Sequence, residues 1–162
     1  MKTGRVVFFM TAAFLLQPAA SFFFSSGSSG PDLLLCMMLA LIFTGSEPAV
    51  VTGAGTVAGC LRDICFSLYA GPGAAGLFTA GLLGALASRL CNWEHLSFRT
   101  IFTGLETLVF QSVLWAGTKI FGTAWNFSAV LWQIPVLSLY NAVFAAGLYM
   151  LLSKEKKGEI RI

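Results

Sequence analysis

Few side chains that could perform acid–base chemistry lie within the apolar stretches of this 162-residue chain. Asp63 and Glu106 are carboxylates in two such stretches, and Asn141 is an amide in a third. Ionisable groups in a membrane are costly, and they usually mark function or pairing. A carboxylate pair could act as acid and base, but the topology predicted below places Asp63 and Glu106 toward opposite sides of a bilayer. We therefore interpret all three as hydrogen-bonding groups between helices or as part of a binding surface.

Histidine and cysteine, which often act as metal ligands or nucleophiles, form no recognisable constellation. His95 is the single histidine, so it has no partners for a metal site or a catalytic triad. Cys36, Cys60, Cys65 and Cys91 include no C-x-x-C pair, and we interpret them as free thiols. No phosphate-loop or dinucleotide fingerprint is present. The sequence predicts a protein that is not an enzyme and has no metal and no cofactor.

The composition indicates a membrane protein. Hydrophobic residues make up 57% of the chain and charged residues 10%, whereas roughly a quarter of the residues in soluble domains are charged. The mean hydropathy is +0.81, and a soluble chain of this length could not bury so much apolar surface. Because helices satisfy their own backbone groups in lipid, we predict an all-α integral membrane protein. Its net charge of +3 fits basic anchors beside the bilayer and requires no nucleic acid.

Turn-rich breaks divide the chain into six apolar segments, which we expect to form one polytopic membrane domain over residues 1–162, a compact bundle. The segments are Arg5–Phe24, Pro31–Thr44, Pro48–Tyr69, Gly73–Cys91, Arg99–Phe121 and Phe127–Leu152. A crossing helix needs about 20 residues, so the second segment could span or re-enter. The first has a basic start and a loose match to a signal-peptide cleavage site. We expect it to be retained, because its apolar stretch continues through residues 22–24.

The distribution of basic residues predicts the orientation, because cytoplasmic loops are enriched in lysine and arginine. If six spans begin inside, eight of the ten basic residues fall on the cytoplasmic side. These are Lys2, Arg5, Arg89, Arg99, Lys154, Lys156, Lys157 and Arg161. Arg62 falls toward the outer side, where its long side chain could reach the interface. Both termini are therefore predicted to be cytoplasmic.

Small residues recur every four positions in the third and fourth segments, which places them on one face of each helix. They are Gly55 and Gly59, followed by Asp63, in the third segment, and Gly76, Ala80 and Gly84 in the fourth. Such faces let membrane helices approach closely. We favour packing within the bundle as their role, with a partner-binding face as the alternative.

Three motifs resemble a known family. Pro31-Asp-Leu-Leu-Leu35 opens the second segment, and the third reads Gly53-Ala-Gly-Thr-Val-Ala-Gly59-Cys-Leu-Arg-Asp63. A second glycine- and alanine-rich helix then begins at Gly71-Pro-Gly-Ala-Ala-Gly76. This order resembles the rod shape-determining membrane protein family MreD. The resemblance covers most of the chain and is most specific across residues 31–88.

The resemblance implies a non-enzymatic scaffold of the bacterial cell-elongation (rod) complex in the inner membrane, acting in cell-shape determination and peptidoglycan synthesis. Its implied partners, besides the lipid bilayer, are an MreC-like bitopic protein and, through it, an MreB-like filament and wall synthases. The implied fold is similar to that of the substrate-binding subunits of energy-coupling-factor transporters. Recognition is expected at Gly55, Gly59 and Asp63, with Pro31 and Asp32 shaping the outer mouth.

A second class of function stays open: a substrate-binding subunit of an energy-coupling-factor transporter for a vitamin or a metal. Such a subunit needs polar and aromatic groups that converge on an outward-open pocket. Trp125, Asn126, Trp132 and Gln133 are the candidates. The outer loops are short and poor in hydrogen-bonding side chains, which favours the scaffold. An intramembrane enzyme is the least favoured class, and the sequence leaves stoichiometry and the partner-facing side open.

Overall fold

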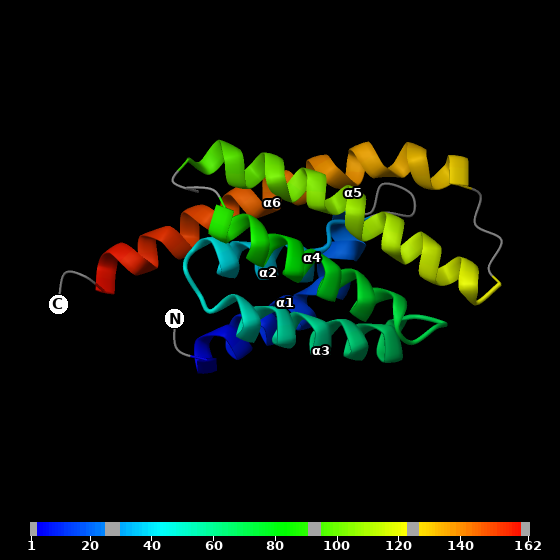
Figure 1. The fold of residues 1–162 in the computed structure, drawn as a ribbon, viewed down its shortest axis with the longest axis horizontal. Helices are drawn as coiled ribbons and strands as arrows, with labels where there is room; N and C mark the ends of the chain where they lie inside the picture. Colours follow the sequence, from blue (N-terminus) through cyan, green and yellow to red (C-terminus); the bar gives the residue numbers. More distant parts are fainter. Residues whose placement is uncertain (1–2, 25–29, 91–94, 123–126, 160–162) are drawn as a thin grey trace.

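A computed structural model describes residues 3–24, 30–90, 95–122 and 127–159. These residues form six helices and no strand. The helices are α1 (Thr3–Phe24), α2 (Leu33–Phe43), α3 (Pro48–Phe66), α4 (Pro72–Leu90), α5 (Leu96–Ile120) and α6 (Phe127–Glu159). Each corresponds to one predicted segment, although α3 ends three residues earlier than expected and α6 continues seven residues further. Consecutive helices run in opposite directions, and both termini lie toward the same end of the bundle (Figure 1).

Four helices are long and apolar enough to cross a bilayer: α1, α3, α4 and the 131–153 part of α6. Their large apolar side chains include many that face outward, such as Phe22, Ile64 and Leu90. Soluble proteins rarely expose contiguous apolar patches on this scale, so the surrounding medium is lipid. The chain is a multi-pass helical membrane protein. Two helices fall outside this group, since α5 is less apolar and α2 has only 11 residues.

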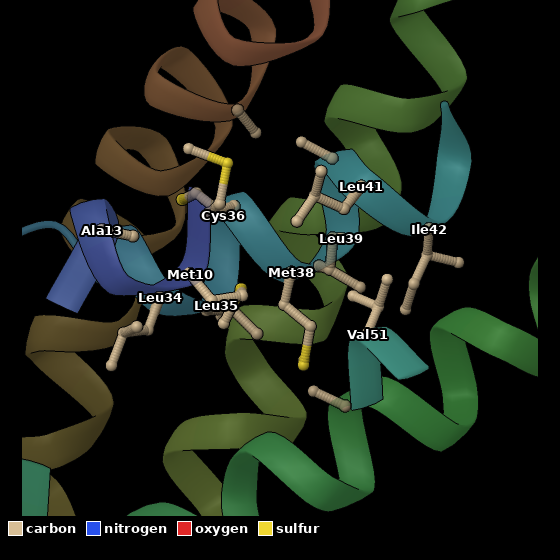
Figure 2. Packing of buried hydrophobic residues seen from close by; sticks show 14 of the residues in the cluster. Met10, Ala13, Leu34, Leu35, Cys36, Met38, Leu39, Leu41, Ile42 and Val51 are labelled. Atoms are coloured by element: carbon tan, nitrogen blue, oxygen red, sulfur yellow. The ribbon is translucent and has the colours of Figure 1, made fainter. Parts of the chain in front are cut away.

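The short helix α2 forms the centre of the bundle. Residues 34–43 are all buried, and α2 lies against each of the five other helices. Figure 2 shows its side chains beside Met10 and Ala13 of α1 and Val51 of α3. A helix of this length rises about 16 Å, roughly half of the hydrocarbon thickness. The second predicted segment is therefore a half-length helix that contacts protein on all sides.

Several residues considered in the sequence analysis lie outside the described part of the chain. They are Lys2, Cys91, Trp125, Asn126 and Arg161. The side chains of residues 154–159, which include three of the predicted cytoplasmic lysines, are also outside it.

Candidate functional site: a buried polar network

The start of α2 is fixed by an aspartate cap. The Asp32 carboxylate accepts a hydrogen bond from the backbone N–H of Leu35 at 3.1 Å, the interaction that favours aspartate at this position. The predicted segment began at Pro31, but α2 begins at Leu33. The two-residue difference arises because Asp32 is the cap and has extended backbone dihedrals. Pro31 therefore precedes the cap.

Gln17 of α1 also hydrogen-bonds to the backbone at the start of α2. Its Oε1 accepts a hydrogen bond from the Leu33 N–H at 2.7 Å, and its Nε2 donates to the Pro31 carbonyl at 2.9 Å. The sequence analysis did not single out Gln17. The available signal was an amide inside an otherwise apolar stretch, the same signal that drew attention to Asn141.

Asn141 connects three helices. Its Oδ1 accepts a hydrogen bond from the Asp32 N–H at 2.8 Å, and its Nδ2 donates to Thr107 Oγ1 on α5 at 3.1 Å. The Asn141 side chain is fully buried. A buried amide must be hydrogen-bonded to be tolerated in an apolar interior. Asn141 is thus a hydrogen-bonding group between α2, α5 and α6.

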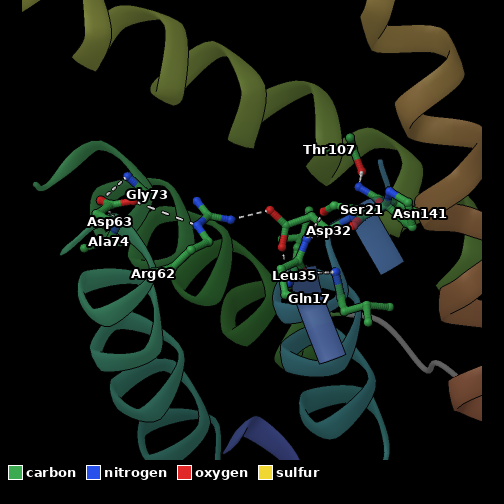
Figure 3. Close-up of polar contacts among 12 residues, drawn as sticks. Gln17, Ser21, Asp32, Leu35, Arg62, Asp63, Gly73, Ala74, Thr107 and Asn141 are labelled. Carbon is green, nitrogen blue, oxygen red and sulfur yellow. Dashed lines mark hydrogen bonds and ion pairs between the residues drawn. The ribbon is translucent and has the colours of Figure 1, made fainter. Parts of the chain in front are cut away.

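Arg62 lies between two carboxylates at the end of α3 (Figure 3). Its Nη1 is 2.5 Å from Asp32 Oδ2, and its Nε is 3.9 Å from Asp63 Oδ1. The guanidinium also lies 5.5 Å from the centre of the Phe110 ring on α5. The structure therefore shows Arg62 turned toward Asp32, a partner that the sequence analysis did not identify. In surroundings with little water, a paired and hydrogen-bonded guanidinium is less costly than an isolated one, and Asp32 supplies that partner.

Asp63 holds the start of α4. Its Oδ2 accepts hydrogen bonds from the backbone N–H groups of Gly71, Gly73 and Ala74 at 3.0, 2.7 and 3.2 Å. The first N–H groups of a helix have no partner within the helix, and a negative charge is favourable there. A Cβ atom at Gly73 would collide with the Asp63 carboxylate and with Arg62. Glycine at this position therefore permits the carboxylate to reach the helix end.

The small-residue faces are buried within the bundle. A Cβ atom on Gly59 would lie 3.0 Å from the backbone of Ala74 in α4, and one on Gly76 would lie 2.8 Å from the Phe110 ring. Gly55 is in close contact with Met38 of α2, and Gly84 with Leu39. Ala80 is also fully buried. Gly55, Gly59 and Asp63, which we expected to recognise a partner, contact other helices of the same chain.

Glu106 does not join the network. Its side chain is buried, with 3% exposed, and it lines a groove between α4 and α5. Its Oε2 has no hydrogen-bond partner among the described residues. Asp32 and Asp63, by contrast, each have several partners.

The network joins all six helices through side-chain and helix-end contacts. Its members are Gln17 (α1), Asp32 (before α2), Arg62 and Asp63 (α3), Gly73 and Ala74 (α4), Thr107 (α5) and Asn141 (α6). These charged groups are hydrogen-bonded to one another and to backbone groups. The network is therefore better suited to holding the helices together than to transferring protons. Within the described ranges, no cluster of three or more His, Cys, Asp or Glu residues could hold a metal ion.

No protein-family model, no curated protein and no solved structure matches the chain.

Proposed function

We propose that this chain is a non-enzymatic scaffold of the bacterial cell-elongation complex, resident in the inner membrane with both termini in the cytoplasm. It would act in cell-shape determination and peptidoglycan synthesis by binding an MreC-like bitopic protein. An MreB-like filament and wall synthases would then associate through that partner. The proposal starts from the MreD-like motifs at Pro31–Leu35, Gly53–Asp63 and Gly71–Gly76.

One observation carries the proposal: residues from the three motifs contact one another. Asp32 pairs with Arg62, and Asp63 accepts the N–H groups at the start of α4. Motifs that build one structural unit support a family resemblance better than unconnected matches would. The common end at which the termini lie (Figure 1) is also where Arg5, Arg89 and Arg99 occur in α1, α4 and α5, as the proposed orientation requires.

The network also supports recognition by helix packing rather than by a solute pocket. Asp32, Arg62 and Asp63 are hydrogen-bonded within the chain, so they are not free to bind a polar ligand. Trp132, a candidate for a transporter's pocket, is 83% exposed on α6. We therefore rank the transporter subunit second.

Depletion of the protein in its source cells separates the two functions. The scaffold predicts that cells lose their elongated shape and that the full-length gene restores it. A requirement for an added vitamin or metal, with cell shape unchanged, would favour the transporter subunit and refute the scaffold.

A further inference from the structure

The outer surface of the bundle has a groove of about 330 Å³ between α4 and α5. Leucines such as Leu86 and Leu105 line it, and they are 54% and 56% exposed. Its other lining residues are apolar except for Glu106. The groove involves the C-terminal half of α4 and the N-terminal half of α5, so it lies toward the end of the bundle where the termini are (Figure 1). In the proposed orientation, this is the cytoplasmic half of the membrane.

Glu106 is the unusual member of this groove. Two threonines near it on α5 are already engaged: Thr103, one turn earlier, contacts the Tyr149 hydroxyl at 3.1 Å, and Thr107, the next residue, accepts from Asn141. Glu106 Oε2 has no hydrogen-bond partner in the described part of the chain. Intramembrane ionisable residues almost always pair with another group or face a polar cavity. Among the described residues the groove offers neither, which leaves Glu106 open to a partner from outside the chain.

We propose that the α4–α5 groove binds a transmembrane helix of a partner protein, which presents a hydrogen-bond donor to Glu106. Lipid tails can fill an apolar groove but have no donor. A donor that reaches this depth must belong to a helix, because irregular backbone is not tolerated in contact with lipid. Serine, threonine, asparagine, glutamine or a basic side chain on the partner would serve, as in other membrane helix pairs.

The identity of the partner rests on the proposed function, which supplies a bitopic protein with a single transmembrane helix. The binding mode does not depend on that identity. It rests on the apolar groove and on a carboxylate oxygen that has no partner among the described residues. The groove volume of about 330 Å³ suits one row of side chains from a helix that lies along the surface. It is too small to hold a complete helix.

Site-specific photo-crosslinking in native membranes tests the inference. A photoreactive amino acid is placed at Leu86 or Leu105 in the groove of the full-length chain, and at Leu139 as a matched control. Leu139 lies on α6 and is 67% exposed. We expect the groove positions, but not the control, to crosslink to the transmembrane segment of a single-pass protein. Mass spectrometry of the adduct should locate a donor side chain in that segment.

A second set of variants tests the role of the carboxylate. Glu106→Leu should lower the crosslink yield by roughly 3- to 20-fold, the range that interhelical hydrogen bonds span in membranes. Glu106→Gln keeps a hydrogen-bonding side chain and should retain most of the yield. Equal amounts of each variant in the membrane fraction, with unchanged thermal unfolding, show that the bundle is intact.

The outcomes separate this inference from the proposed function. Adducts with lipid alone, adducts with a second copy of the chain, or a yield unaffected by Glu106→Leu would overturn the inference. If an MreC-like protein co-purifies but crosslinks only from other faces, the proposal for the groove is wrong and the proposed scaffold function stands. A Glu106-dependent groove adduct with an unrelated single-pass protein would support the groove and refute the cell-elongation role.

Discussion

Replacing Asp63 with leucine should destabilise the bundle without preventing its insertion. The substitution removes the acceptor of three N–H groups at the start of α4. Two of these, on Gly73 and Ala74, are buried. A buried donor left without a partner costs about 1–3 kcal/mol, so the free energy of unfolding should fall by about 2–6 kcal/mol in total. Leucine favours membrane insertion, so the amount of protein in the membrane should not change.

Equilibrium unfolding of the purified protein in detergent micelles measures this difference. Asp63→Asn retains one side-chain oxygen that can accept hydrogen bonds, so it should lose less stability than Asp63→Leu. Ile64→Leu is the matched control, because Ile64 is the next residue and is exposed. It should change the free energy of unfolding by no more than about 0.5 kcal/mol. The account of the α3–α4 connection would be refuted if Asp63→Leu were as stable as the wild type, or equal to Asp63→Asn.

Three further predictions use the same unfolding assay. Removing either partner of the partly buried pair, by Arg62→Met or Asp32→Asn, should cost about 1.5–3 kcal/mol, the range for hydrogen bonds to charged groups, and the double variant should cost less than the sum; additive costs would contradict the pairing. Gly59→Ala should cost about 1–3 kcal/mol because its Cβ meets the backbone of α4. Gly53→Ala, where a Cβ meets open space, should be nearly neutral, and equal effects at the two glycines would count against the close approach of α3 and α4. Asn141→Leu removes the acceptor of the Asp32 N–H and should cost about 1–3 kcal/mol, with faster hydrogen exchange at that amide; unchanged exchange would argue against the bond.

The helices could be predicted from the sequence because local signals mark their ends. Pro48 and Pro72 each occupy the first position of a helix, where a missing N–H is no loss. Gly71, with a φ of +123°, lies in the turn between α3 and α4. These residues act over a few positions, so hydropathy and punctuation were sufficient to find all six helices.

The partners of the polar groups could not be predicted, because they depend on how distant helices meet. Arg62 and Asp32 are 30 residues apart, and nothing local distinguishes a guanidinium that reaches to the interface from one that turns toward α2. Gln17 was missed for the same reason, since its importance comes from the backbone it meets at Pro31 and Leu33. That Glu106 Oε2 has no partner in the described ranges is likewise visible only once its neighbours are placed.

The small-residue faces of α3 and α4 show a different limit of prediction from sequence. The four-residue spacing of Gly55 and Gly59 predicts close packing but not what packs there. A helix of the same chain and a helix of a partner satisfy the same pattern, because both need only a close backbone approach. The tertiary contacts, with α2 and α4, are what favour the internal role.

Purification of the tagged full-length protein in mild detergent, with identification of the proteins that remain bound, tests the central proposal most directly. The scaffold predicts recovery of an MreC-like bitopic protein together with wall synthases. Recovery of paired ATPases and a second membrane subunit, with no cell-elongation proteins, would contradict it and identify the chain as a transporter component.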